Sequence, residues 1–326
     1  MKKNTARFSF LAMLAAAIII NPFTASYFES FKMAVPAGNM TNSLYDEIAA
    51  KSKSYEAAPQ NAEIHKIWKA TPGYNGLTVD VNASYEKMKK GGKFDDSLLV
   101  FKQVPPVIHL KDLPPSPIYR GNPEKPMVSF LINVAWGNEY IPKMLDTLTK
   151  YHVKATFFLE GRWVKENPEL AKMIADAGQE IGNHSYTHPD MSRLSSDAIR
   201  SQIQKTNEVI QAATGKKTVW FGPPSGSFRD EVTKVSRQMN MGMVLWSVDT
   251  IDWQKPSPEV LFARVMKKVH NGAMILMHPT DSTEKSLEKL ILSIRKKGLM
   301  LGTVTSLMSE ERIITHPGQE TVQDQQ

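Results

Sequence analysis

Between residues 127 and 307, short apolar runs alternate with longer segments in which apolar positions recur every three or four residues. Such runs are typical of buried strands, and the longer segments are typical of amphipathic helices. Strands are expected within 127–132, 155–159, 179–182, 218–221, 242–246, 273–277 and 300–304. Helices are expected within 142–151, 167–178, 195–214, 229–239, 258–269 and 282–297. This alternation predicts an α/β fold with a parallel sheet or barrel, whose chemistry lies at the carboxyl ends of the strands.

The preceding residues, 40–104, mix both patterns and predict a small α+β N-terminal domain. A helix is expected after Asn42 and another within 83–90, with strands within 77–81 and 97–101. Seven prolines then fall between residues 105 and 126. Proline disfavours helix interiors and central strands, so 105–126 is expected to be an extended linker. Residues 127–307 form the large domain, and the glutamine-rich end, 318–326, is expected to be a disordered tail.

The first 26 residues have the pattern of an export signal. Three basic residues precede an apolar run from Phe8 to Ile20, and Asn21 and Pro22 end that run. The run has the length of a signal-peptide core and is short for a membrane span. Residues 1–26 are therefore expected to be a signal peptide or, if uncleaved, an N-terminal membrane anchor. Either places the protein outside the cytoplasm, in the cell envelope or beyond it.

Composition narrows the chemistry further. The 326 residues include no cysteine, and 40 Lys and Arg against 33 Asp and Glu give a formal net charge of +7. Without cysteine, thiol nucleophiles, disulfides and thiolate metal sites are excluded, so a metal would need His, Asp, Glu or Asn. The positive charge suits nucleic acid and anionic envelope polymers equally well. The export signal favours an envelope polymer, and no nucleic-acid partner is expected.

Polar residues gather where the predicted strands end. His184 and His188 follow the strand within 179–182, and at a spacing of four residues on one helical turn both can face a single metal ion. Other strand ends carry His278, the acids Asp249 and Asp252 with Trp253, and a rigid loop with Pro223 and Pro224. Taken singly, a core histidine or a turn-forming acid explains each of them. Their occurrence at successive strand ends indicates a site.

The order of these motifs resembles that of the NodB-like polysaccharide deacetylases, carbohydrate esterase family four. The resemblance covers about residues 125–305, and its most specific element is the His-Ser-x-x-His motif at 184–188. The family fold is a distorted (β/α) barrel of seven strands, and its members remove acetyl groups from chitin oligomers, peptidoglycan or xylan. The resemblance implies that His184 and His188 bind zinc or another divalent metal. It also implies that His278 is the general acid and that Asp252 orients it. The implied substrate-binding residues are Trp253, Pro223 and Pro224.

The chain departs from the family in two motifs. The family's first motif supplies a general base and then a metal-binding carboxylate, and these positions are Asn133 and Val134 here. Asn133 replaces the base but has no carboxylate to accept a proton, and Val134 cannot bind a metal. The third-motif arginine that steadies the base is Gly222. Any divalent metal is therefore expected to be weakly held, and the standard catalysis to be impaired.

Three functions are compatible with these residues. The first is a deacetylase-fold protein that binds N-acetylated cell-wall glycan such as peptidoglycan without standard catalysis. The second is an active N-deacetylase in which another acid, such as Asp249, stands in for the base. The third is a non-catalytic envelope assembly protein that contacts its partners through the N-terminal domain and linker. The Asn-Val-Ala-Trp form of the first motif also resembles the YlxY-type subgroup of endospore-forming bacilli, which implies a role in sporulation and the spore cortex.

Overall fold

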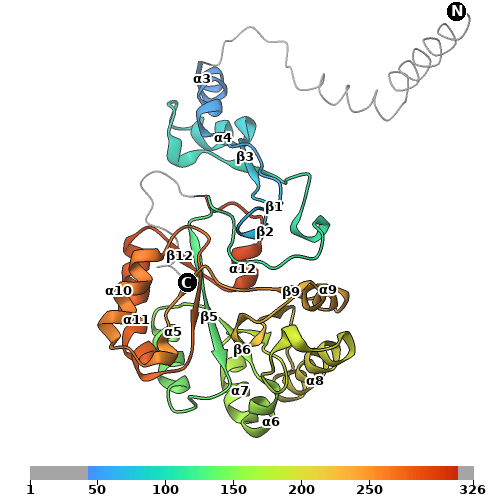
Figure 1. Ribbon diagram of the computed structural model, residues 1–326. Helices are drawn as coiled ribbons and strands as arrows, with labels where there is room; N and C mark the ends of the chain where they lie inside the picture. The colour runs from blue at the N-terminus through green and yellow to red at the C-terminus, as the bar shows by residue number, and fades with distance from the viewer. Residues whose placement is uncertain (1–42, 315–326) are drawn as a thin grey trace, which may run out of the picture. The chain divides into compact units, whose positions relative to one another are not determined.

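The computed structural model describes residues 43–314 (Figure 1). The expectations for residues 1–26 and 318–326 lie outside this range. The chain divides into two units, Met1–Glu47 and Ile48–Gln326, and the following description concerns the second, apart from the first residues of α3 (Ser43–Ser52). Within the described range, no helix is both long enough and apolar enough to cross a membrane.

A parallel sheet of eight strands forms the centre of this unit. The strand order is β10-β11-β5-β6-β7-β8-β9, and β12 pairs with the first residues of β5. The sheet is a curled half-barrel that is not closed, because β9 and β10 do not pair with each other in the described part of the chain. This confirms the predicted distorted barrel, although β10 was not expected as a strand. The strands are β5 (Met127–Val134), β6 (Thr156–Leu159), β7 (Glu180–Asn183), β8 (Trp220–Phe221), β9 (Gly242–Met243), β10 (Val248–Asp249), β11 (Met274–Met277) and β12 (Met300–Leu301).

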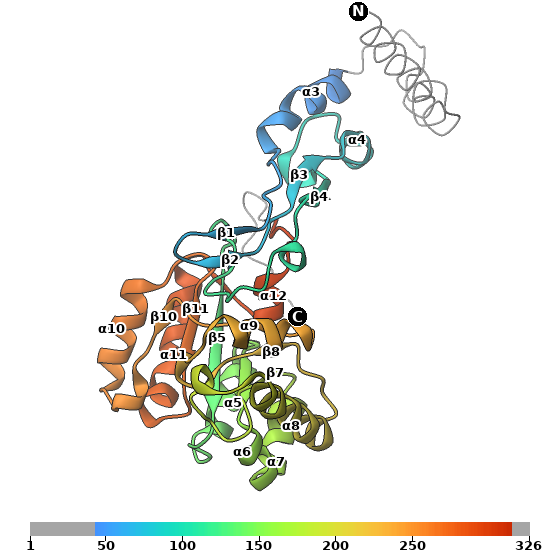
Figure 2. The same cartoon turned by 45° about the vertical axis from the view of Figure 1, so that its right-hand side comes forward.

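Helices connect these strands, and their ends follow local sequence signals (Figures 1 and 2). Pro168 and Pro258 occupy first helical positions, where the missing N–H has no helical partner to lose. Ser195 caps α8 by accepting from the Ala198 N–H, and Gly215 ends that helix with a φ of +70°. The helices are α5 (Ile141–Lys150), α6 (Gly161–Glu166), α7 (Pro168–Asp176), α8 (Ser196–Thr214), α9 (Asp230–Gln238), α10 (Pro258–Lys268), α11 (Asp281–Lys296) and α12 (Val304–Met308).

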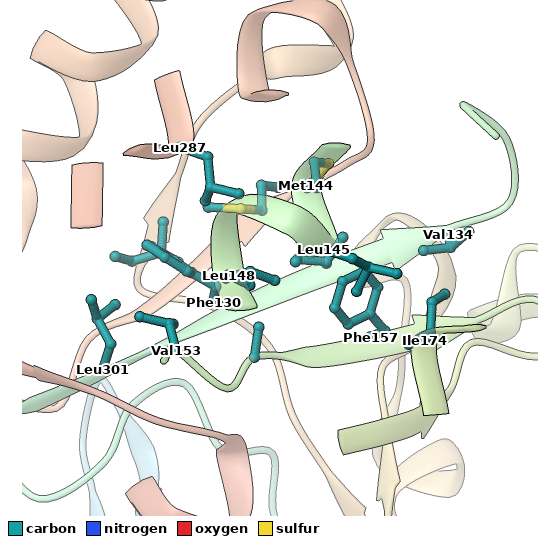
Figure 3. Packing of buried hydrophobic residues seen from close by; sticks show 14 of the residues in the cluster. Phe130, Val134, Met144, Leu145, Leu148, Val153, Phe157, Ile174, Leu287 and Leu301 are labelled. Carbon is teal, nitrogen blue, oxygen red and sulfur yellow. The ribbon is translucent and has the colours of Figure 1, made fainter. Parts of the chain in front are cut away.

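Strand β5 is buried along its whole length, but its two faces meet different surroundings. On one face, alternate residues ending at Val134 join the main hydrophobic cluster, together with Leu145 from α5 and Leu287 from α11 (Figure 3). On the other face, Leu131 packs in a second cluster and Asn133 lines a cavity. Because successive side chains of a strand point to opposite faces, Asn133 and Val134 are separated by the sheet itself.

The residues before the sheet form two small antiparallel pairs with short helices. The helix predicted within 83–90 is present as α4, and Asp80 caps it by accepting from the Ala83 N–H at 3.0 Å. The strand predicted within 97–101 starts only at Phe101, because Asp95 caps a 3-10 turn over Asp96–Leu98. Strands β1 and β2 were not predicted. The elements are α3 (Ser43–Ser52), β1 (Glu63–His65), β2 (Lys69–Thr71), β3 (Gly76–Val79), α4 (Val81–Met88) and β4 (Phe101–Val104).

A short segment near the end of the described chain, residues 309–313, lies against these small pairs, and we call it the C-terminal strap. The Arg312 N–H donates to Gln103 Oε1 at 2.7 Å, and Arg312 Nε donates to the Asn75 carbonyl at 2.6 Å. The Asn75 N–H in turn donates to the Glu310 carbonyl at 2.7 Å. Buried Lys125 donates to two carbonyls at the end of α12, at 2.7 and 2.6 Å. The strap therefore joins the small pairs to the main sheet, whereas the domain boundaries at 104 and 126 stay predictions.

Candidate functional site

Residues from several strand ends line one cavity of about 460 Å3, which we call the site cavity. It is lined by six of the residues singled out from the sequence: Asn133, His184, His188, Asp249, Trp253 and His278. Asp252 lies behind His278. Pro223 and Pro224 are buried and adjoin the cavity through Ser225. The roles of these residues stay predictions, but their convergence is a structural fact.

The two histidines of the His-Ser-x-x-His motif lie close together, but the residues between them do not form a helical turn, so the predicted helical turn was wrong. Asn183 Oδ1 accepts from the Ser185 N–H at 2.9 Å, and Ser185 Oγ accepts from the His188 N–H at 3.2 Å. These bonds accompany positive φ values of +63° at Ser185 and +52° at His188. Side chains that bond to the nearby backbone favour such loops over helix. The two imidazole rings still lie 5.1 Å apart at 70°.

Burial keeps both histidines of this pair neutral. His184 is only 2% exposed, and desolvation, with the neighbouring His188, lowers its pKa to about 3. Desolvation also lowers the pKa of His188. His184 Nδ1 lies 2.7 Å from the Gly222 carbonyl, which can only accept, so Nδ1 carries the hydrogen and Nε2 keeps a free lone pair. Such a nitrogen can bind a cation or accept a hydrogen bond from a ligand.

The third histidine is held by a buried carboxylate. Asp252 is fully buried, and its Oδ1 lies 2.8 Å from His278 Nδ1. Its Oδ2 accepts from the His278 N–H at 2.6 Å and from Thr283 Oγ1 at 2.7 Å. In addition, the indole of Trp136 stacks on the imidazole, with ring centres 5.8 Å apart and planes within 8°. The carboxylate thereby holds one edge of the His278 ring, and the indole covers one face.

The turn that carries Asp252 and Trp253 has a strained backbone. It is a 3-10 turn, Asp252–Gln254, between Ile251 at φ +52° and Lys255 at φ +53°. A left-handed conformation is unusual for a β-branched residue such as Ile251 and costs on the order of 1–3 kcal/mol. Asp249 Oδ1 supports the turn by accepting from the Ile251 N–H at 2.8 Å. The surrounding contacts offset this strain and hold Trp253 at the rim, 55% exposed.

These residues do not fit the family's three-ligand metal site. Among residues 43–314, no three His, Asp or Glu side chains are grouped so that they could hold one metal ion. His184 and His188 are present, but Val134 has no exposed surface and packs in the hydrophobic cluster (Figure 3). At Gly222, where the family has an arginine, an added Cβ would meet the Phe158 ring at 3.0 Å. The standard metal-activated water therefore lacks both its third ligand and its base.

Two aromatic residues of the site cavity were missed by sequence reasoning. Trp136 and Trp246 line it beside Trp253. A signal for Trp136 was available, since it comes two residues after the end of a buried strand, where site residues of parallel sheets gather. Trp246 follows β9, and no feature of its surrounding sequence distinguishes it from a core residue.

The sheet is parallel and curled, and its carboxyl edge carries the pair His184 and His188 together with His278, which a carboxylate holds. This fold and this site are of the carbohydrate esterase type. The polysaccharide deacetylase family model matches residues 120–244. The chain is 56% identical over 308 residues to YlxY of Bacillus subtilis, covering 94% of this chain and 97% of that protein. It is 32% identical over 200 residues to the B. subtilis peptidoglycan-N-acetylmuramic acid deacetylase PdaA, covering 60% and 76%. The chain therefore belongs to the polysaccharide deacetylase family, as the motifs predicted.

Solved structures show the same relationship and bear on activity. A crystal structure of BA3943, described as a CE4 family pseudoenzyme from Bacillus anthracis, matches with a TM-score of 0.80 and 60% identity, covering 83% of this chain and 96% of that chain. A mutant of BA3943 with restored enzymatic activity matches with the same TM-score and identity. Impaired catalysis in the present chain, expected from its first motif, agrees with this neighbour.

Proposed function

We infer that the chain binds N-acetylated cell-wall glycan of the peptidoglycan type in the site cavity and does not carry out the family's standard deacetylation. The position of Asn133 carries this inference. Its amide lines the cavity beside His184 and His188, where the family has a general base, and an amide accepts no proton at neutral pH. The cavity retains hydrogen-bonding groups and indoles that suit an N-acetylated sugar.

The relatives support the choice of ligand. PdaA and the Bacillus cereus peptidoglycan-N-acetylglucosamine deacetylase, 35% identical over 181 residues, are both named for peptidoglycan. The basic start and apolar run of residues 1–20 support export, so the envelope is the proposed location and a membrane contact is proposed only for an uncleaved signal. A link to sporulation is likewise a proposal, supported by the first-motif resemblance.

Metal binding is expected to be weak, because two neutral imidazoles offer two ligands where the family's metal site has three. Equilibrium dialysis against Zn2+ should give lower affinity than for an active deacetylase, with His184→Ala lowering it further. If the chain bound Zn2+ as tightly as an active family member does, a third metal ligand besides His184 and His188 would be present, and the expectation of weak binding would be wrong.

The decisive experiment measures acetate release and glycan binding on the same samples. The native chain should bind N-acetylated peptidoglycan fragments and release no more acetate than His184→Ala. Asn133→Asp, which differs from the native residue by one group, should raise acetate release by placing a base in the cavity. Asn240→Asp is the matched control, because Asn240 is exposed and lies outside the site cavity. Acetate release by the native chain that His184→Ala abolishes would overturn the proposal.

An active enzyme with a substitute base is the second candidate, and the position of Asp249 favours it. This carboxylate lines the same cavity as the histidine pair. One of its oxygens accepts from the Ile251 N–H, which leaves the other available to a ligand. Asp249→Asn should abolish acetate release if this candidate is right, and should leave glycan binding without release if the first proposal is right.

A further inference from the structure

Another cavity lies at the opposite edge of the main sheet from the site cavity. It has a volume of about 420 Å3, within the range of about 300–1,000 Å3 that is usual for small-ligand pockets, and we call it the rear cavity. It is lined by residues at the amino ends of β8 and β9, beside α12, whereas the site cavity lies at the carboxyl ends of the strands (Figures 1 and 2). Among residues 43–314, the two cavities share no lining residue. A ligand of the rear cavity would therefore leave the site cavity free.

Three separate segments form the walls of the rear cavity. Residues 110–118 form the first wall, residues 305–309 form the second, and the starts of β8 and β9 with the end of α9 form the third. The deacetylase family model matches residues 120–244. The first two walls lie outside that part of the chain, so the rear cavity is not explained by the matched family region.

Hydrogen bonds hold these walls in fixed positions. The Ile118 N–H donates to the Met243 carbonyl at 3.0 Å, and the Leu245 N–H donates to the Ile118 carbonyl at 2.8 Å. Trp220 Nε1 donates to Thr305 Oγ1 at 2.8 Å. The first wall is thereby joined to β9, and the indole is joined to α12. The rear cavity is therefore a formed pocket between three connected elements.

The interior of the rear cavity is apolar. Ile118, Met243 and Met308 line it and are respectively 3%, 2% and 6% exposed. A Cβ at Gly242 would lie 2.3 Å from the Trp220 ring, so this indole packs directly on the backbone of β9. Methionine side chains are flexible and polarizable, and they adapt to ligands of irregular shape. An apolar chain placed here would gain affinity with every CH2 group that it removes from water.

Both charged residues that line the rear cavity are basic. Lys111 is exposed and Arg237 is half-buried, and none of the described lining residues is Asp or Glu. Arg237 Nη2 donates to the Lys111 carbonyl at 2.6 Å and to the Leu113 carbonyl at 3.0 Å. A guanidinium has five N–H donors, so these two bonds leave the donors on Nε and Nη1 for an anion. The charge of the cavity therefore suits a ligand with an acidic head.

We propose that the rear cavity binds an amphiphile with one anionic head group, a phosphate or a carboxylate, and one apolar tail. The tail lies among Trp220 and the two methionines, and the head lies at Lys111 and Arg237. A free phosphate would leave the apolar walls in water, and a cationic amphiphile would meet two charges of its own sign. The end of the chain itself, residues 315–326, is an unsuitable occupant, because Val322 is its one large apolar side chain.

Calorimetric titration of the full chain with decyl phosphate, below the concentration at which it forms micelles, tests this proposal. The native chain should bind decyl phosphate at least about tenfold more tightly than octyl phosphate, because each of the two added CH2 groups contributes roughly a factor of four when buried. Decyltrimethylammonium has the same tail and the opposite charge, and it should bind at least about tenfold more weakly. Inorganic phosphate, which is the head without a tail, should give no measurable heat at the same concentration.

Variants of exposed lining residues test whether the charge of this cavity is responsible. Lys111→Gln should weaken decyl phosphate binding by about twofold to fivefold, and Lys111→Arg should retain it. Lys66→Gln is the matched control, because Lys66 is an exposed lysine outside the rear cavity. Val219 lines the cavity and is 49% exposed, so Val219→Glu should weaken binding more than Val219→Gln, which loses the same apolar group without adding a charge. Thermal unfolding midpoints establish that each variant is folded.

Three results would overturn the proposal. Equal affinity for the phosphate and ammonium amphiphiles, or native affinity in both Lys111→Gln and Val219→Glu, would show that the basic residues of the rear cavity do not hold the head. Displacement of decyl phosphate by a peptidoglycan fragment would place the amphiphile in the site cavity. A native chain that binds no amphiphile but sediments as a dimer, which Val219→Glu converts to a monomer, would show that a second copy covers this surface. Each result leaves the proposed glycan function standing, because that function concerns the other edge of the sheet.

Discussion

Replacing Val134 with aspartate would supply the carboxylate that the family's metal site requires, yet we expect it to destabilise the protein. Val134 has no exposed surface and belongs to the hydrophobic cluster under α5 and α11. Asp and Val are similar in volume, so overpacking contributes little. Burying a polar group without hydrogen-bond partners costs about 1–3 kcal/mol in protein mutants, and losing a buried Val side chain adds about 1.5 kcal/mol. Val134→Asp should therefore lower the free energy of unfolding by roughly 2.5–4.5 kcal/mol.

The pH dependence gives this prediction a distinctive sign. Burial should raise the pKa of the introduced carboxyl, so the folded variant binds more protons than the unfolded chain above about pH 4. Its stability relative to the native chain should therefore decline as the pH rises. Urea unfolding at pH 5 and pH 8 measures this, with Val134→Thr as a control of nearly the same shape whose loss should not change with pH. A variant as stable as the native chain, or one that Zn2+ stabilises, would show that position 134 faces the histidine pair and would refute the reasoning.

Three further predictions concern other parts of the molecule. His184 has a pKa of about 3 in the folded protein, below the ordinary 6.5. Its contribution to stability should therefore be complete above about pH 6.5 and be lost as the pH falls from there towards 3. His184→Gln should remove this pH dependence from the free energy of unfolding measured in urea. Asp252→Asn should lower the unfolding free energy by about 2–4 kcal/mol, because it disturbs three hydrogen bonds of a buried group, and NMR should report a freer His278 ring. Arg312→Ala should expose the small strand pairs to proteolysis before the main sheet, whereas Lys165→Ala, a change of another basic side chain in the main unit, should not.

The fold was largely predictable because strands buried on both faces leave continuous apolar runs in the sequence. β5, β6 and β11 were all located in this way. β1 and β2 were not, because each is only three residues long, which is too short for a periodic pattern of apolar and polar residues to show. β10 is only two residues long and was interpreted as a strand end.

Site residues were predictable from the sequence only where an uncommon polar side chain directly follows an apolar run that predicts a strand. The histidine pair and His278 follow apolar runs and carry uncommon side chains, so they were found from the sequence. Trp136 was missed because its stacking on His278 depends on the approach of Gly137 to Pro279, which joins loops more than 140 residues apart along the chain. The opposite surroundings of Asn133 and Val134 likewise follow from the strand geometry of β5 and not from the residue types.

The C-terminal strap also determines the stage of protein synthesis at which the fold can be completed. Its hydrogen bonds join Arg312 to Gln103, residues 209 positions apart, and Glu310 to Asn75, which lies still further back in the chain. During synthesis, the small strand pairs emerge first and the strap emerges after the whole main sheet. The early segment must therefore wait, without its final partners, until the ribosome has made nearly all of the described chain. Within the described residues, a segment that is made late therefore completes the bonds of strand pairs that are made early.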